Sequence, residues 1–392
     1  MNPLRISTYT VSSAVGTGRA AHAHALRSGT SGLKRLAFDT STLDCWLGEV
    51  RDFDVPLTGS LAAFDCRNNR LAEFALSHDR FPDVVADSRR RYGPTRVGVF
   101  VGTSTSGVHH TELAYRERDV ASGALPAWLD QRRTQNTFSV AEFVALRLGL
   151  AGPALAISTA CSSSAKVFAT ATRAIAAGVC DAAVVGGVDS LCLTTLYGFN
   201  SLQLLSADIC RPADSARLGI SIGEAGGFAL LDPAAESGLA LLGYGESSDA
   251  YHMSSPEPTG RGAIESMRSA LRRADVTPAE VDYINLHGTG TVANDIAESR
   301  AVCEVFGTAT PCSSTKGWTG HTLGAAGIVE AAISLLSIEH DFMPRSLNTR
   351  TRDPAIEAGI LLDTRMAPVR RVLSNSFGFG GSNCSLLFGR LS

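Results

Sequence analysis

Four short segments of this 392-residue chain carry residue types that can do covalent or proton-transfer chemistry. The first is Thr159-Ala160-Cys161-Ser162-Ser163, which joins an expected strand over 154–158 to an expected helix from Ser163 to Ala177. The N–H groups at a helix start favour a thiolate, and a sharp strand-to-helix turn projects its side chain. Cys161 is therefore a candidate nucleophile, although its position alone supports a small buried apolar side chain equally well.

Two histidines follow in similar settings. His287 begins His287-Gly-Thr-Gly-Thr291, after an expected strand over 281–286, and on these residues alone a structural turn is the more frequent explanation. His321 ends the segment 313–321 and precedes an expected apolar helix. A helix dipole would hold this imidazole neutral, so that it can donate an N–H to a developing oxyanion. We expect Lys316 to pair with a carboxylate such as Glu330, with plain surface charge as the alternative.

The fourth segment, Asn375 to Asn383, is rich in glycine and lies near the C-terminus. A strand that ends in such a turn can offer backbone N–H groups to an oxyanion. It is not a phosphate-binding loop, because no Gly-Lys-Ser/Thr follows and no helix is evident after it. Without other information it is equally a tight structural turn.

The elements that must position these segments alternate between strands and helices, which is typical of an α/β protein. The strand at 154–158, the helix after it and a buried strand over 181–186 predict a right-handed parallel crossover. Further strands are expected over 6–11, 96–101, 226–232, 239–245 and 384–388, and further helices over 61–78, 137–148, 260–274, 295–306 and 325–340. Residues 30–60 are expected to be mostly loop.

The four segments together, in this order and spacing, resemble the elongating β-ketoacyl-acyl carrier protein synthases, which are condensing enzymes. Gly102-Thr-Ser-Thr-Ser-Gly107 and Ser247-Ser-Asp-Ala-Tyr-His-Met253 match that family as well. The resemblance is clearest from 96 to 389. It implies a thiolase-like α/β fold with five α-β-α-β-α layers, built from two similar halves that we place at 1–234 and 235–392.

The resemblance also implies a role for each site residue. Cys161 carries the acyl group, His287 and His321 stabilise the enolate formed when a malonyl thioester loses carbon dioxide, and Lys316 with Glu330 forms a supporting ion pair. Cys161 and Phe379 are expected to supply the backbone N–H groups of an oxyanion hole, and Phe379 matches the gating phenylalanine of the family. The expected substrate contacts are Thr289, Thr291, Phe377 and Gly378.

The partner implied by the resemblance is an acidic acyl carrier protein, whose phosphopantetheine arm delivers the substrate, so no metal and no other cofactor is expected. A homodimer, or a heterodimer with a ketosynthase-like chain-length factor, is expected. The net charge of −3 argues against non-specific binding of nucleic acid. Candidate basic patches for the carrier are Ser88 to Arg91 and Gln131 to Arg133.

Nine cysteines without a Cys-x-x-Cys pair, no secretory signal and no membrane-spanning stretch predict a cytoplasmic protein. A thiolase would need a second cysteine in a Cys-x-Gly motif, and Cys384 has no such context. A priming synthase would have asparagine where this chain has His321. A silent chain-length factor usually lacks the nucleophile, so this chain resembles the active subunit. Fatty-acid and polyketide or aryl polyene synthesis both remain open, and the segment Phe64 to Ala72 favours the aryl polyene type.

Overall fold

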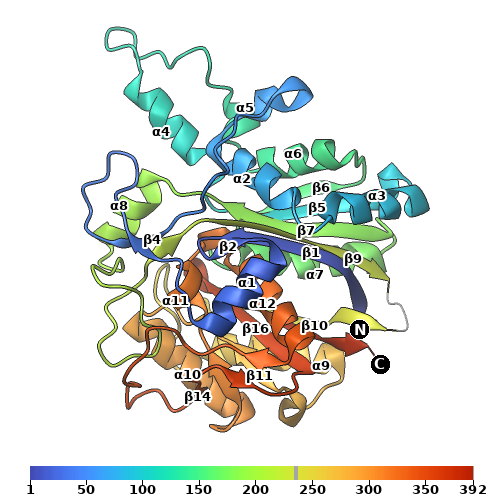
Figure 1. Cartoon of the computed structure of the whole chain (residues 1–392), viewed down its shortest axis with the longest axis vertical. Helices are drawn as coiled ribbons and strands as arrows, with labels where there is room; N and C mark the ends of the chain where they lie inside the picture. The colour runs from blue at the N-terminus through green and yellow to red at the C-terminus, as the bar shows by residue number, and fades with distance from the viewer. Residues whose placement is uncertain (234–236, 392) are drawn as a thin grey trace.

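The computed structural model describes residues 1–233 and 237–391 as a mixed α/β protein (Figure 1). The strands are β1 Leu4–Ser13, β2 Gly16–Thr17, β3 Lys34–Arg35, β4 Trp46–Gly48, β5 Val97–Gly102, β6 Ala154–Ile157, β7 Ala182–Asp189, β8 Ile222–Gly223, β9 Ala225–Pro233, β10 Gly238–Ser248, β11 Tyr283–Asn285, β12 Pro311–Ser313, β13 Phe342–Met343, β14 Gly359–Ile360, β15 Arg365–Met366, β16 Arg371–Gly378 and β17 Ser382–Leu391. The helices are α1 Gly18–Ser28, α2 Arg67–Leu76, α3 Phe81–Tyr92, α4 Val108–Arg116, α5 Gln131–Thr134, α6 Ser139–Leu148, α7 Ser163–Ala176, α8 Leu193–Ser201, α9 Arg261–Ala274, α10 Val292–Phe306, α11 Lys316–Thr319 and α12 Ala326–His340, with short 3₁₀ turns that include Gly59–Phe64 and Leu323–Ala325.

The main sheet consists of two groups of strands that repeat one topology. The first group has the spatial order β6-β5-β7-β9-β1, and the second has β12-β11-β16-β17-β10 with β14 added at its edge. In both groups the first three strands are parallel and the last two are antiparallel to their neighbours. The groups join only at a short pairing of β1 with β10. Corresponding strands therefore occupy corresponding places in the two halves.

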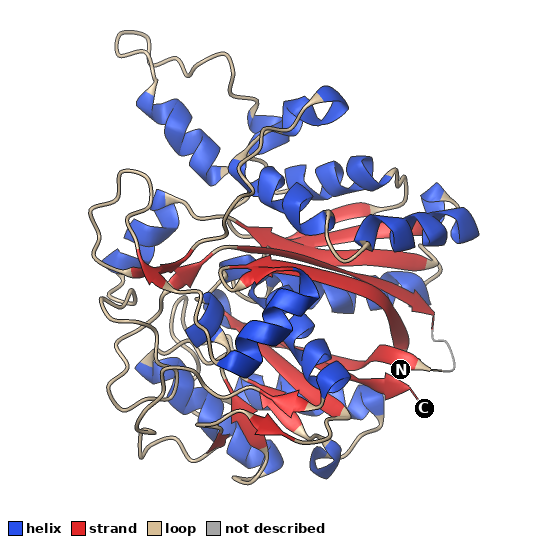
Figure 2. Ribbon diagram, in the orientation of Figure 1, coloured by secondary structure: helices blue, strands red, loops and turns tan. Residues whose placement is uncertain are grey.

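Helices lie on both faces of each strand group and make five layers (Figure 2). Helices α2, α3 and α6 cover the outer face of the first group, and α9 and α10 cover the outer face of the second. Between the groups, α7 packs against α12. This middle layer holds the largest apolar core, which includes Phe168, Ile328 and Leu335. The predicted five-layer thiolase-like fold is thus the observed one.

Most predicted elements are present, and the differences have local causes. The helix expected over 61–78 is broken at Asp65 and Cys66, which are extended between a 3₁₀ turn and α2. Asp65 accepts a hydrogen bond from the Leu57 N–H and two from the Arg70 guanidinium, and these contacts hold the chain out of helical geometry. The sequence interpretation also missed α1, α3, α4 and α8.

The proposed division at 234/235 falls on residues outside those described, so it stays a prediction. The segment Leu323–His340 is long and apolar enough to cross a membrane by composition, but 89% of it is buried inside the protein. It contains α12, the central helix of the middle layer. Its apolar composition follows from being packed on all sides by strands and by α7.

The close approach of α7 and α12 can be tested at Gly327. A Cβ atom there would lie 2.4 Å from the backbone nitrogen of Ala165, so Gly327→Ala must push the two helices apart. We expect the free energy of unfolding to fall by about 1–3 kcal/mol, measured by urea denaturation. Gly198→Ala is the control, since a Cβ on that helical glycine meets nothing within 4 Å. Equal effects of the two variants would contradict this packing.

Candidate active site

Cys161 lies in a tight turn between β6 and α7, as predicted. Ala160 has a φ of +52°, a left-handed conformation that a non-glycine residue adopts only when its surroundings hold it there. Hydroxyl groups supply that support: Ser162 donates to the Thr159 carbonyl over 2.9 Å, and Ser163 donates to the Ala160 carbonyl over 2.5 Å. The small and hydroxylated neighbours of Cys161 thus build the turn that places its sulfur.

His287 follows β11, and its backbone is held from two sides. Glu298, on α10, accepts the backbone N–H groups of His287 and Gly288, each over 2.8 Å. The Lys316 ammonium donates to the His287 carbonyl over 2.5 Å and lies 3.4 Å from its Nδ1. Because an ammonium group can only donate, Nδ1 is an acceptor and the ring proton is on Nε2.

The imidazole of His287 is neutral. Burial, with a smaller contribution from Lys316, lowers the pKa of His287 well below its usual range. A neutral ring that carries its proton on Nε2 is a hydrogen-bond donor toward the cavity that it lines. This is the form needed to stabilise negative charge on an oxygen atom.

His321 lies in the loop between α11 and the turn that leads into α12. Its N–H donates to the Ser221 carbonyl over 2.7 Å, and its own carbonyl accepts from Gly223 over 3.0 Å. Its Nε2 is 3.0 Å from the sulfur of Cys161. Burial, followed by the charge of Lys316, lowers the pKa of His321 well below its usual range. This agrees with the neutral imidazole that the sequence predicts.

The thiol of Cys161 has a higher pKa than the sequence suggested. Burial raises the pKa of the Cys161 thiol to about 11, although Lys316 and the Phe379 N–H act to lower it. The expectation that the helix start favours a thiolate is therefore wrong, because desolvation of the charge outweighs the nearby donors. Cys161 is a thiol at neutral pH, and it needs a neighbouring base, for which His321 is placed.

Lys316 and Glu330 form the predicted ion pair, and both side chains are almost completely buried. Burial raises the pKa of Glu330 to about 7 against the opposing effect of Lys316. Neither residue lines the cavity. Their contacts with substrate are therefore indirect, through His287 and through the field that Lys316 exerts on both imidazoles and the thiol.

A cavity of about 440 Å³ opens onto these groups. The rings of His287 and His321 are nearly perpendicular, with centroids 5.4 Å apart. The ring of Phe379 lies 5.6 Å from that of Phe199 on α8. The predicted substrate contacts all line the same cavity: Thr289, Thr291, Phe377, Gly378 and Phe379, together with Cys161, His287 and His321.

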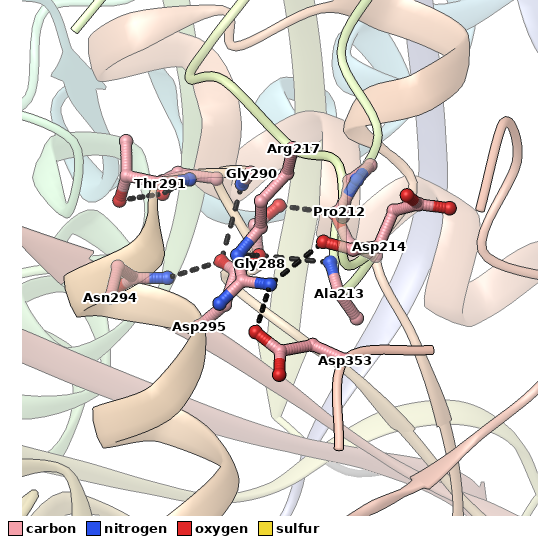
Figure 3. Close-up of polar contacts among 12 residues, drawn as sticks. Pro212, Ala213, Asp214, Arg217, Gly288, Gly290, Thr291, Asn294, Asp295 and Asp353 are labelled. Atoms are coloured by element: carbon pink, nitrogen blue, oxygen red, sulfur yellow. Dashed lines mark hydrogen bonds and ion pairs between the residues drawn. The ribbon is translucent and has the colours of Figure 1, made fainter. Parts of the chain in front are cut away.

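Behind the cavity wall, and reaching it at Arg217, lies an ionic network that the sequence interpretation missed (Figure 3). Asp295 accepts the N–H of Gly290 over 3.2 Å and that of Ala213 over 2.9 Å, so it joins the turn after His287 to the loop that follows α8. Arg217 lies 3.5 Å from Asp295 and donates to Asp353 over 2.6 Å. The sequence shows these charged residues but not their pairing, because the partners are distant in sequence.

Glu298 was also missed, although burial raises its pKa to about 7 and it holds the backbone of His287. The candidate basic segments for the carrier lie outside this cavity, and their role stays a prediction. Arg90 pairs with Asp87, Arg133 pairs with Asp130, and no residue of Ser88–Arg91 lines the cavity.

One atom each from Cys161, His287 and His321 could together bind a metal ion, since these atoms lie within 4.8 Å of one another. Thiolate and imidazole are ligands that suit zinc. The same three residues line the cavity, so a metal held there would occupy the polar groups that face it.

Comparisons with known proteins agree with this geometry. Residues 71–237 match the family model described as beta-ketoacyl synthase, N-terminal domain, and residues 239–350 match the corresponding C-terminal domain. The 3-oxoacyl-[acyl-carrier-protein] synthase 2 of Coxiella burnetii is 31% identical, over 94% of this chain and 93% of the relative.

Two solved structures are similar along nearly the whole chain. The ketosynthase ApeO, solved with its chain length factor ApeC from Xenorhabdus doucetiae, is 39% identical with a TM-score of 0.90 and covers 99% of this chain and 98% of its own. The ishigamide ketosynthase/chain length factor is 28% identical with a TM-score of 0.87 and 99% coverage of each chain.

The raised pKa of Cys161 predicts how its reactivity depends on pH. Because the thiolate is the reactive form, alkylation of Cys161 by iodoacetamide should accelerate about tenfold per pH unit between about pH 7 and 9, without a plateau. Peptide mass spectrometry measures the rate at Cys161 separately from the other eight cysteines. A plateau between about pH 6 and 8 would contradict a buried thiol.

The Lys316–Glu330 pair predicts a stability effect that is not additive. Lys316→Met leaves the Glu330 carboxylate buried without its cation, so the free energy of unfolding should fall by about 3–5 kcal/mol. Adding Glu330→Gln removes that charge and should recover part of the loss, as measured by urea denaturation. A double variant as unstable as the sum of both single variants would argue against a direct pairing.

Proposed function

Since the chain belongs to the β-ketoacyl synthase family, we propose that it joins an acyl group held on Cys161 to a malonyl group delivered by an acyl carrier protein. The reaction is a decarboxylative Claisen condensation, and the enzyme is an acyltransferase. The observation that carries the proposal is the 3.0 Å contact of the Cys161 sulfur with His321 Nε2, beside a neutral His287 in one cavity.

The first half-reaction loads the enzyme. The thiol proton of Cys161 passes to His321 as the sulfur attacks the carrier thioester, and the carrier leaves as a thiol that takes up the proton. The backbone N–H groups of Cys161 and Phe379 are proposed to stabilise the oxyanion of this step. Covalent catalysis of this kind divides one difficult transfer into two easier ones.

The second half-reaction forms the carbon–carbon bond. The bond between the malonyl carboxylate and its α-carbon breaks, carbon dioxide leaves, and the electron pair remains as an enolate. The Nε2–H of His287 is proposed to donate to the enolate oxygen, and His321 is proposed as the second donor after its ring proton moves from Nδ1 to Nε2. The α-carbon then attacks the acyl carbonyl on Cys161, and the departing thiolate takes up a proton from water.

The carrier arm is proposed to reach the sulfur through the described cavity. Thr289 and Thr291 line it and hydrogen-bond to each other over 2.9 Å, so either hydroxyl can turn to an amide of the phosphopantetheine. Phe377, Gly378 and Phe379 are proposed to contact the substrate, with Phe379 as the gate beside Phe199. The proposed reaction uses no metal and no redox cofactor.

A heterodimer with a chain-length factor is the more specific form of the proposal. It is supported by the similarity to a ketosynthase that was solved with such a partner, which is 39% identical over 99% of this chain, whereas 3-oxoacyl-[acyl-carrier-protein] synthases that are 38% and 39% identical match 75% and 62% of it. The arm formed by α4, residues 117–130 and α5 projects from the body of the protein (Figure 1). Its Val120 and Trp128 are 96% and 43% exposed, as expected of a surface that a partner covers.

We also propose a cytoplasmic location, since all nine cysteines are free thiols. The segment Phe64 to Ala72 and the similarity to a ketosynthase with a chain-length factor favour an aryl polyene or polyketide pathway over primary fatty-acid synthesis. The cavity, together with the partner surface that completes it, decides which acyl chain is accepted.

Intact-mass measurement tests the function. The purified chain, alone and co-expressed with a chain-length factor, is incubated with a panel of saturated and polyenoic acyl carriers and then with malonyl carrier. The expected result is an acyl adduct on Cys161 that disappears as a β-ketoacyl carrier, longer by two carbons, forms. Absence of any adduct across the panel, with and without partner, would refute the proposal.

The two half-reactions should respond differently to His321→Ala. Loading should slow, because the contact with the Cys161 sulfur is lost, and condensation should slow further, by about 10²–10³, because an oxyanion donor is missing. Single-turnover assays with preformed acyl-enzyme separate the two steps. Cys161→Ala is the control and should show no acyl adduct; equal loss of both steps in His321→Ala would indicate a purely structural histidine.

A further inference from the structure

A buried carboxylate beneath the active site connects the segments that carry its two central atoms. Asp189, the last residue of β7, is completely buried. It accepts hydrogen bonds from the Thr103 hydroxyl over 2.7 Å, from the Ser104 N–H over 2.8 Å, and from both the N–H and the hydroxyl of Thr105 over 2.9 Å. Its other oxygen accepts the Gly324 N–H over 2.6 Å.

The first connection leads to Cys161. The turn 103–105 continues β5, and its Ser104 hydroxyl donates over 3.3 Å to the carbonyl of Ala160, the left-handed residue before the nucleophile. Gly102, at the end of β5, passes so close to α7 that a Cβ would lie 2.3 Å from the Ser164 nitrogen. The turn that Asp189 holds therefore supports the backbone that aims the sulfur.

The second connection leads to His321. Gly324 is three residues beyond His321, in a turn where Leu323 has a φ of +52°. A Cβ on Gly324 would lie 2.7 Å from the Asp189 carboxylate and 2.7 Å from the Ser104 hydroxyl, so the turn rests directly on this network. The carboxylate thus bonds directly to the turn after His321 and, through Ser104, reaches the turn that carries Cys161.

We propose that Asp189 is a positioning residue, which holds the Cys161 sulfur and the His321 Nε2 at reaction distance through the 103–105 turn and Gly324. Hydrogen bonds from one carboxylate to two segments, the 103–105 turn and Gly324, fix their relative position more tightly than packing of small side chains does. Displacement of about 1 Å between reacting groups is enough to slow a reaction by about 10²-fold.

The negative charge of Asp189 has a second consequence, which concerns the pKa of the Cys161 thiol. The negative charges of Glu330 and Asp189 raise the pKa of the Cys161 thiol, and the positive charge of Lys316 lowers it. Removing the Asp189 charge must lower the pKa of the thiol, so alkylation should shift to lower pH. A residue with a merely structural role would change stability without moving this profile.

Asp189→Asn tests both consequences. Its amide NH₂ cannot accept the Gly324 N–H, so we expect kcat for condensation to fall at least tenfold, with KM for the acyl carrier changed less than twofold. The pH profile of Cys161 alkylation should shift to lower pH. Asp189→Glu keeps the charge but displaces it, so it should retain the wild-type alkylation profile while condensation stays slow.

Asp214→Asn is the matched control. Asp214 is also buried and accepts three backbone N–H groups, from Ala216, Arg350 and Thr351, but it has no bond to the segments that carry Cys161 or His321. It should lose stability without a change in the alkylation profile. Ser104→Ala, which removes only the link to Ala160, covers the case in which Asp189→Asn fails to fold, and should slow loading about fivefold.

The kinetic part of this inference rests on the proposed function, but alkylation of Cys161 does not. If the carriers are not accepted at all, the shifted alkylation profile of Asp189→Asn still supports the positioning role. An unchanged profile, or an equal change in Asp214→Asn, would overturn it. If Asp189→Asn does not fold, wild-type loading in Ser104→Ala would overturn it as well.

Discussion

Lys316 is an ammonium group in the interior of the protein, and its three donors must find acceptors there. It finds them in Glu330, in the carbonyl of His287 and beside Nδ1 of the same ring. The cation therefore sets the tautomer of His287, adds to the burial that keeps both histidines neutral, and partly offsets the effect of burial on the pKa of the Cys161 thiol. A site that had no buried cation would leave Glu330 as an unpaired buried charge and the His287 imidazole without a defined proton.

The two strand groups explain why these residues meet. Helix α7 follows β6 and α12 follows β12, and these two strands have the same place in their groups. Cys161 precedes α7, and His321 precedes the turn into α12. The repeated topology therefore brings the N-terminal ends of the two helices together at one end of the middle layer. The close packing at Gly327 then sets the separation of the helices, and with it the separation of sulfur and imidazole.

Three buried carboxylates hold the loops around the cavity in place. Asp189 joins the 103–105 turn to Gly324, Glu298 holds His287 and Gly288, and Asp295 joins Gly290 to Ala213. Each carboxylate accepts hydrogen bonds from backbone N–H groups of loop residues, which have no neighbouring strand to pair with at that point. Such bonds satisfy buried donors and leave the cavity side of each loop free for substrate.

Local pattern was enough to predict the strand–turn–helix unit around Cys161, whereas Cys161, both histidines and the Lys316–Glu330 pair stood out as site residues only through the resemblance of the four ordered segments to one family. Strand and helix periodicity is a local property, so it is visible in the sequence, and so is the tight turn that a run of small residues permits. Only the tertiary structure decided the protonation of Cys161, because a pKa depends on burial by residues far away in the chain. It also decided the roles of Asp189, Glu298 and Asp295, because a carboxylate becomes a support only when the fold brings it beneath a distant backbone N–H.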